Sequence, residues 1–319
     1  MKKCILFLLL LLGITISAKA QVQPTDTDGD GYINISTLDH LQWISENTSS
    51  WGNNFELDNN INAAATANWN GKEGFSPIGN FSTPFTGKFE GHGFTIDNLF
   101  INMPNINYVG LFGRTIGAEI SNVGIVNCRF TGNFYVGGLV GSNDENSTIN
   151  NSFSKGEING NTAVGGLVGS NFSYSIVRNS YSTSNITGAK VYAGGLVGSN
   201  YQASTISNCY CSGNVTGTDS TGGLVGLNFY STVSNSYSTS KVSGNSTMGG
   251  LVGLEYYSRV INSFWDSQTS GISTSAGGTG KTTVEMKTKS TFTDAEWNFN
   301  LVWAIDATIN NGYPFINDR

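Results

Sequence analysis

The stretch YVGGLVGSN, residues 135–143, decides the fold that we expect, because the chain repeats it. Its variants are YVGLFGR (108–114), AVGGLVGSN (163–171), YAGGLVGSN (192–200), STGGLVGLN (220–228) and TMGGLVGLE (247–255). The leucines of the six copies lie 28, 28, 29, 28 and 27 residues apart. A period this regular predicts a solenoid in which each repeat stacks on the one before it.

A second segment accompanies the motif and reads STINNSFS, SIVRNSYS, STISNCYC, STVSNSYS and SRVINSFW. Its central asparagines are Asn151, Asn179, Asn208, Asn235 and Asn262. Each has an apolar residue two positions earlier and an aromatic residue two positions later. This period of two predicts that all three side chains share one face of a strand. We therefore expect the asparagines to be buried and to pair amide to amide along the stack.

A third segment closes each repeat and reads FTG, INGN, ITG, VTG and VSG. Its apolar members are Phe130, Ile158, Ile186, Val215 and Val242. Three short strands in about 28 residues fit one turn of a right-handed parallel β-helix, whose coils rise by about 4.8 Å each. A β-prism or a propeller is the alternative, although a propeller blade is usually longer.

The open ends of a solenoid need covers, and the sequence predicts short helical caps at both ends. Ser36 to Asp39 resembles a capping box, and apolar residues follow it at helical spacing. Near the other end, SAGGTGKTT (275–283) looks like a nucleotide-binding loop, but Ser275 stands where that motif needs its first glycine. We expect a glycine turn there, then a capping box from Thr282 to Glu285, a short helix and no nucleotide.

The first twenty residues have the features of a secretory signal peptide: two lysines, an apolar run and the cleavage pattern Ala18-Lys19-Ala20. Their removal takes away three lysines and no acid, which changes the net charge from −6 to −9. An acidic chain without a basic stripe is a poor partner for nucleic acid. We expect an exported protein, secreted or on the cell surface, without a transmembrane segment.

Composition also favours stacked β-structure with tight turns, since the chain has 41 glycines, 5 prolines and only 12% charged residues. Three cysteines would remain after cleavage: Cys128, Cys209 and Cys211. An odd number does not suggest a disulfide framework. We expect them to be small apolar residues inside the stack.

The GGLVGSN repeats resemble the GLUG motif. The stretches DGDGYINISTLDHLQWIS and FTGKFEGHGFTIDNL resemble the usual beginning of GLUG-repeat modules, and SAGGTGKTTVEMK with NNGYPF resembles their usual end. The resemblance implies a secreted or surface-exposed bacterial protein, often adhesin-like, with a β-helical module. GLUG repeats also occur in immunoglobulin-A-cleaving metallopeptidases, but the zinc motif H-E-x-x-H is absent, and the only histidines, His40 and His92, are expected to be ordinary.

The stretch DTDGDGYINIST, residues 26–37, resembles an EF-hand-type calcium loop. Positions 1, 3, 5 and 7 of that loop fall on Asp26, Asp28, Asp30 and Tyr32, the last through its carbonyl. Position 12, usually a bidentate glutamate, is Thr37. We therefore expect a weak Ca²⁺ site, and a plain acidic turn is the alternative.

Aromatic residues follow the GGLVG strands: Phe172, Tyr174, Tyr201, Phe229, Tyr230, Tyr256 and Tyr257. If exposed, they would form a stripe suited to stacking on sugar rings, and the alternative is burial between coils. A glycosidase would need two carboxylates across a cleft. The acids of the repeats do not recur in register, so we expect no catalytic residues.

These features predict one solenoid domain with five segments. They are a signal peptide (1–20), an acidic calcium-loop-like segment (21–37), an N-terminal cap with irregular first coils (38–107), the GLUG-repeat β-helix (108–266) and a C-terminal cap (267–319). The expected function is non-catalytic binding or adhesion to glycans, host-matrix or cell-surface proteins. Two alternatives stay open: a carbohydrate-active β-helix enzyme, either a polysaccharide lyase or a glycosidase, and a passive spacer in a surface assembly.

Overall fold

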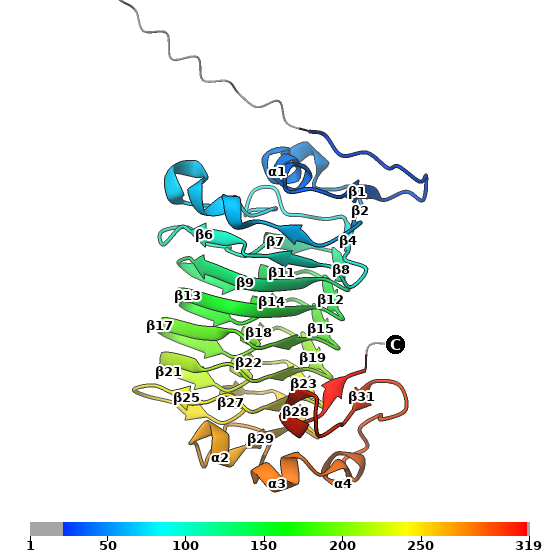
Figure 1. The fold of residues 1–319 in the computed structure, drawn as a ribbon. Helices are drawn as coiled ribbons and strands as arrows, with labels where there is room; N and C mark the ends of the chain where they lie inside the picture. Colours follow the sequence, from blue (N-terminus) through cyan, green and yellow to red (C-terminus); the bar gives the residue numbers. More distant parts are fainter. Residues whose placement is uncertain (1–21, 318–319) are drawn as a thin grey trace, which may run out of the picture.

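The computed structural model describes residues 22–317 and shows a parallel β-solenoid (Figure 1). Three sheets of nine, fifteen and six strands run along it, and a two-stranded antiparallel sheet lies near the C-terminus. The expected all-β solenoid is confirmed, and the β-prism and propeller alternatives are wrong. The expected signal peptide lies outside the described residues.

The GGLVG motifs form the six-stranded sheet. Its strands are β7 (Phe112–Ile116), β11 (Val140–Asp144), β14 (Val168–Phe172), β18 (Val197–Tyr201), β22 (Val225–Phe229) and β27 (Val252–Tyr256). They pair in parallel and in register, so that Val140 lies between Phe112 and Val168. A Cβ atom on Gly169 would lie 2.5 Å from the carbonyl oxygen of Gly141, so only glycine fits where the backbones pass this closely.

The nine-stranded sheet contains short strands. In the regular coils, each of them follows the GGLVG strand after a turn of a few residues. They are β1 (Ile33–Ile35), β2 (Phe55–Leu57), β4 (Lys88–Glu90), β8 (Glu119–Ser121), β12 (Thr148–Asn150), β15 (Ile176–Arg178), β19 (Thr205–Ser207), β23 (Thr232–Ser234) and β28 (Arg259–Ile261). From β4 to β23, the central residue of each strand is buried. These apolar residues form one side of the core, and their neighbours in the strand face outward.

The fifteen-stranded sheet joins the ends of the repeats. Its strands are β3 (Ile61–Asn62), β5 (Thr95–Asp97), β6 (Phe100–Asn102), β9 (Gly124–Thr131), β10 (Phe134–Gly137), β13 (Phe153–Gly165), β16 (Tyr181–Ser182), β17 (Asn185–Gly194), β20 (Tyr210–Cys211), β21 (Val215–Gly222), β24 (Tyr237–Ser238), β25 (Val242–Ser243), β26 (Met248–Gly249), β29 (Phe264–Asp266) and β30 (Thr279–Lys281). The apolar residues of the third segment, such as Ile158 and Ile186, are buried partners in it. Cys128, Cys209 and Cys211 are free and buried, as expected. Burial raises the pKa of Cys128 and Cys209 to about 12, so both stay protonated thiols.

The expected burial of the Asn151 series is wrong, and the expected pairing is seen for one pair, in which the side-chain amide of Asn208 donates to Oδ1 of Asn179 at 3.2 Å. Asn151 lies at the corner between β12 and β13 with a φ of 48°, a left-handed conformation that asparagine tolerates better than most residues. The turn at this residue breaks the period of two. Ile149 therefore points into the core, whereas the ring of Phe153 lies on the outer face and is only half-buried.

A buried asparagine ladder does exist, but the last residue of the GGLVGSN motif forms it. Its members are Asn143, Asn171, Asn200 and Asn228, all 0% exposed. Each side-chain amide donates to the Oδ1 atom of the next member at 2.9 Å. At the first coil, Thr115 donates its hydroxyl to Oδ1 of Asn143. The ladder satisfies polar groups that would be costly to bury alone.

Helices cover both ends of the solenoid, as expected. At the N-terminal end lies α1 (Leu38–Glu46), whose N-cap is Thr37 and not Ser36, because Oγ1 of Thr37 accepts from the amide of His40. The hydroxyl of Ser36 instead donates to Asp58. The 3-10 turns η1 (Thr48–Ser50), η2 (Ala64–Asn68) and η3 (Asn70–Lys72) follow in the irregular first coils.

The C-terminal end carries α2 (Ser267–Ser270), α3 (Thr283–Met286) and α4 (Lys289–Thr293). The expected capping box between Thr282 and Glu285 is present and starts α3. The glycine-rich stretch before it contributes β30, which pairs with β29 as a last partial rung. The stretch that resembles a nucleotide-binding loop therefore forms part of the last rung of the solenoid.

After α4 the chain turns back, and a hairpin of β31 (Trp303–Ala304) and β32 (Phe315–Ile316) lies beside the last coils (Figure 1). The turn η4 (Asn310–Gly312) lies between these two strands. This cap has its own apolar cluster, in which Phe292, Trp297 and Trp303 pack on Tyr210 and Tyr237 of the solenoid. Within residues 22–317, no helix has the length and the apolar character needed to cross a membrane.

Candidate functional site

Aromatic rings at the end of the six-stranded sheet form a stacked column. Phe172 and Tyr201 lie 5.6 Å apart between ring centroids, Tyr201 and Phe229 lie 4.5 Å apart, and Phe229 and Tyr256 lie 5.2 Å apart. They stack because they are in-register partners on β14, β18, β22 and β27. The first three are half-buried and Tyr256 is exposed, so the column reaches the surface.

The other three aromatic residues of this set lie at the adjoining corner. Tyr174, Tyr230 and Tyr257 are 61%, 51% and 70% exposed, and each has a positive φ. Tyr230 stacks on Tyr257 at 5.1 Å and meets Tyr256 edge to face. The structure thus places all seven residues at the surface along one edge of the solenoid. We call this set the corner aromatic stripe.

On the coil before Phe172, an ion pair takes the place of a further aromatic ring. Asp144 is the strand partner of Phe172, so a carboxylate stands where the next ring of the column would be. Its Oδ2 atom lies 2.6 Å from Nε of Arg114. Burial raises the pKa of Asp144, although hydrogen bonds from Ser142 and Arg114 oppose that effect.

The three aspartates of the calcium-like loop lie together. Each of Asp26, Asp28 and Asp30 offers one carboxylate oxygen, and these oxygens lie within 4.8 Å of one another at the exposed surface. The backbone amides of Gly29 and Gly31 donate to Asp26 and lower the pKa of its carboxyl. This arrangement fits a hard cation that prefers oxygen ligands.

Two other details concern the remaining ligand positions of the loop. Thr37 uses its hydroxyl oxygen to cap α1, and its side chain offers no carboxylate for position 12. The amide of Tyr32 donates to Asp30 at 2.8 Å, which holds the turn in place next to the position whose carbonyl would be the fourth ligand. Together with Asp26 and Asp28, these are the groups that could hold the ion.

Hydrogen bonds connect this loop to the side of the solenoid. Thr27 donates to Oδ1 of Asn34, and the amide group of Asn34 donates to the buried carboxylate of Glu56 at 2.7 Å. The other oxygen of Glu56 lies 2.8 Å from Nε2 of His92. That hydrogen bond raises the pKa of His92 above its ordinary value, so His92 carries more positive charge near neutrality than a free histidine.

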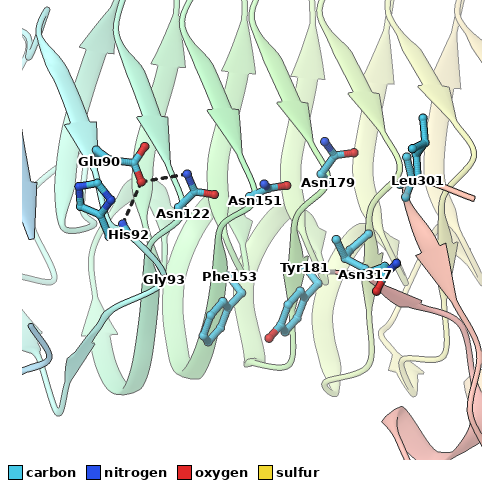
Figure 2. A pocket seen from close by; sticks show the side chains of 12 residues that line it. Glu90, His92, Gly93, Asn122, Asn151, Phe153, Asn179, Tyr181, Leu301 and Asn317 are labelled. Carbon is cyan, nitrogen blue, oxygen red and sulfur yellow. Dashed lines mark hydrogen bonds between the residues drawn. The ribbon is translucent and has the colours of Figure 1, made fainter. Parts of the chain in front are cut away.

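His92 lies at one end of a groove with a volume of about 800 Å³ (Figure 2). The solenoid side of the groove consists of Glu90, His92, Gly93, Asn122, Asn151, Phe153, Asn179 and Tyr181. The C-terminal cap supplies Leu301, Val302, Ile316 and Asn317. Sequence patterns did not single out this site, since one wall folds back from more than a hundred residues away.

The acids of the repeats, which a glycosidase or lyase would have to use, are dispersed. They are Asp144, Glu145, Glu157, Asp219 and Glu255. Asp144 and Glu145 both approach Arg114. Glu255 follows Asn228 in the six-stranded sheet, and burial raises its pKa. None of the five is among the described residues that line the groove.

Four stretches of the chain match the model of the GLUG motif: residues 132–159, 160–187, 191–216 and 217–243. These matches coincide with the regular coils of the solenoid. The resemblance to GLUG-repeat β-helix proteins is therefore confirmed.

Two relatives match about a third of the chain. Over 111 residues it is 42% identical to "Halomucin" of Haloquadratum walsbyi, which covers 34% of this chain and 1% of that protein. Over 118 residues it is 34% identical to a "Putative Gly-rich membrane protein" of Evansella cellulosilytica, which covers 34% of this chain and 13% of that protein. The matched stretches are therefore small parts of much longer proteins.

Among solved structures, a "putative immunoglobulin A1 protease" from Bacteroides ovatus has a similar fold, with a TM-score of 0.69. The match covers 92% of this chain and 93% of that chain at 21% sequence identity. At this identity the likeness concerns the fold alone and says nothing about activity.

Proposed function

We propose that this GLUG-repeat solenoid is a non-catalytic binding module, secreted or on the cell surface, that attaches to glycans through its corner aromatic stripe. The observation that carries the proposal is the exposure of Tyr174, Tyr230 and Tyr257 along one edge. Soluble proteins seldom leave several large aromatic rings together in water without a use for them. Tyrosine also combines an apolar ring with a hydroxyl, which suits ligands that carry both C–H and O–H groups.

The geometry of the stripe defines the contacts that it can make. Rings inside the column cover one another's faces, so a ligand meets their edges there. Tyr257, at the last full coil, has the largest exposed fraction of the set. It is therefore the residue on which a sugar ring would stack most readily.

Two other functions fit the structure less well. A polysaccharide-degrading enzyme would need two carboxylates facing one cleft, and the candidate acids of the repeats are scattered. A passive spacer would need no exposed aromatic stripe. The names of the relatives, a halomucin and a Gly-rich membrane protein, fit a role at the cell surface, although the chain matches only small parts of them.

We also propose that the Asp26–Asp30 loop binds Ca²⁺ weakly. The loop hydrogen-bonds to Asn34 in β1, the first strand of the nine-stranded sheet. An ion held there would stabilise the N-terminal cap and need not contact a ligand.

The test is a binding assay of the purified protein on immobilised polysaccharides and matrix proteins, with reducing ends scored in the same wells. Tyr230→Ala and Tyr257→Ala should each weaken retention about fivefold, since stacking of one ring contributes about 1 kcal/mol. Phe81→Ala is the matched control, because Phe81 is 66% exposed and belongs to a different aromatic column with Tyr108 and Tyr135. Release of reducing ends, or equal losses in the control, would overturn the proposal.

A further inference from the structure

We propose that the groove between the corner asparagines and the C-terminal hairpin is a second binding site, specific for an uncharged, extended oligosaccharide. The site lies on another edge of the solenoid from the corner aromatic stripe, because the short strands of the nine-stranded sheet separate the two corners. It therefore does not depend on the function proposed above.

The first argument is a row of side-chain amides. Asn122, Asn151 and Asn179 occupy the same corner of three successive coils and follow one another along the groove (Figure 2). Successive coils place them about 4.8 Å apart. An extended chain of β-linked pyranoses advances by a similar step per sugar, so each sugar can meet one amide.

The amides have hydrogen-bonding capacity to spare. Asn122 donates to Glu90, and Asn179 donates to Asn150, but each retains a second N–H. Within the described residues, the exposed side-chain amide of Asn151 has no hydrogen-bond partner. Amide groups both donate and accept, which matches the hydroxyl groups of a sugar.

The second argument is an apolar strip beside the amides. The rings of Phe153 and Tyr181 stack at 4.9 Å with an angle of 1° between their planes, and both are half-buried. The same column continues with Tyr210 and Tyr237, which the C-terminal cap covers. Phe153 and Tyr181 are the less buried rings of this column and line the groove, and Tyr181 also packs against the cluster of the cap.

The third argument is charge. None of the described residues that line the groove is lysine or arginine. The carboxylate of Glu90 accepts from His92, Ser121 and Asn122, and the ring of His92 is held by Glu56. Lys155 lines the adjoining hollow together with Phe153 and Tyr181, but within the groove itself an acidic glycan would lose hydration and meet no lysine or arginine.

The cap also limits the length of the site. Leu301 is 72% exposed and stands across the groove beyond Asn179 (Figure 2). The amide row thus has three members between His92 and the hairpin. We infer that the groove holds about three sugars of a longer chain.

The experiment is calorimetric titration of the purified protein with β-1,4-linked hexasaccharides of glucose, mannose and xylose, and with hexagalacturonate as the acidic probe. At least one neutral hexasaccharide should bind, and hexagalacturonate should bind at least about tenfold more weakly. Asn151→Gly should weaken binding about three- to tenfold, the equivalent of one hydrogen bond. Glycine accepts the positive φ of this position, so the change removes the amide without straining the backbone.

Two further variants complete the test. Asn262→Gly makes the same change at the same corner of the last coil, outside the groove, and should leave affinity unchanged. Leu301→Arg alters the opposite wall at an exposed position and should weaken binding at least about tenfold. Circular dichroism would verify that each variant is folded. If Leu301→Arg does not fold, the affinity of Asn151→Gly decides the test.

Three results would overturn the proposal. The first is no binding of any neutral hexasaccharide. The second is equal binding of hexagalacturonate. The third is binding that Tyr257→Ala abolishes while Asn151→Gly leaves it intact, which would assign the ligand to the corner aromatic stripe.

Discussion

The side-chain amide of Asn171 donates a 2.9 Å hydrogen bond to Oδ1 of Asn200, its counterpart one coil further along the solenoid. Both residues are completely buried. The same amide also donates to the carbonyl of Ser175, so it links two coils and the turn that follows its own strand. Each rung of the ladder therefore depends on the rung before it and the rung after it.

Replacing Asn171 with alanine should reduce the free energy of unfolding by about 2–4 kcal/mol, because it leaves a buried donor on Asn143 and a buried acceptor on Asn200 without partners. Chemical denaturation measures the loss. Asn151→Gly is the control and should change stability by less than about 0.5 kcal/mol, since that amide is exposed. Equal effects of the two changes would contradict the assignment of the buried ladder.

Removing Arg114 should destabilise the protein by about 3 kcal/mol, because Asp144 would remain buried without its ion-pair partner. The double variant Arg114→Leu with Asp144→Phe should regain most of that loss at pH 7. A ring at position 144 would stack on Phe172, its strand partner, and lengthen the aromatic column by one coil.

A titration checks the electrostatic part of this prediction. Burial raises the pKa of Asp144, so an unpaired carboxylate is costly above the ordinary pKa and harmless once protonated. The destabilisation caused by Arg114→Leu should thus shrink as the pH falls from 7 to about 4. A double variant no more stable than Arg114→Leu would show that the column cannot be extended.

The C-terminal cap should loosen in acid through Asp266. Burial alone would raise the pKa of this carboxyl, but hydrogen bonds to it from the Thr269 amide and from the Tyr313 and Thr283 hydroxyls outweigh burial and lower the pKa. A lowered pKa in the folded state means that the stabilisation is complete above the ordinary value of 3.8 and is lost as the pH falls below it.

The variant Asp266→Asn tests whether this carboxylate causes the loosening of the cap in acid. It should cost about 1–3 kcal/mol at pH 7 and should remove the loss of stability below about pH 4. The fluorescence of Trp297 and Trp303, which are buried in the cap, reports the change. An unchanged acid transition in the variant would exclude Asp266 as its origin.

Calcium should raise the melting temperature of the protein, and Asp28→Ala should abolish that increase. With affinities of about 10⁻⁴–10⁻³ M, expected for a loop without a position-12 carboxylate, 10 mM calcium stabilises by about 1–3 kcal/mol. Tb³⁺ luminescence sensitised by the adjacent Tyr32 gives a second measurement. Asp306→Ala, a change of another exposed acid outside the loop, is the control. Equal calcium effects on all three proteins would rule out a site at the loop.

The regular coils could be predicted because a repeat of about 28 residues fixes both the strand spacing and the register. The position of Asn151 could not be predicted from the same pattern. A period of two is the signature of a strand, and only the backbone conformation shows that this asparagine turns the chain instead of continuing the strand. The buried ladder could not be predicted for the same reason, although its asparagines stand at the end of the GGLVGSN motif.

The candidate sites also differ in how far the sequence predicts them. The aspartates and the aromatic residues are close in sequence to the features that position them, so the sequence pointed to them. The groove depends on the packing of Trp303 and its neighbours against Tyr210 and Tyr237, contacts between segments far apart in the chain. No local pattern predicts such a contact, and His92 therefore looked ordinary.

The in-register stacking of coils gives this protein a length that changes in fixed increments. Strand β14 pairs with β11 on one side and with β18 on the other through the same motif positions. If one whole repeat were removed or added, the coils on either side would therefore still pair in register. Each added repeat would make the rod longer by about 4.8 Å and leave the caps and their contacts as they are. The number of GGLVG motifs thus works as a ruler that sets how far apart the two ends are held.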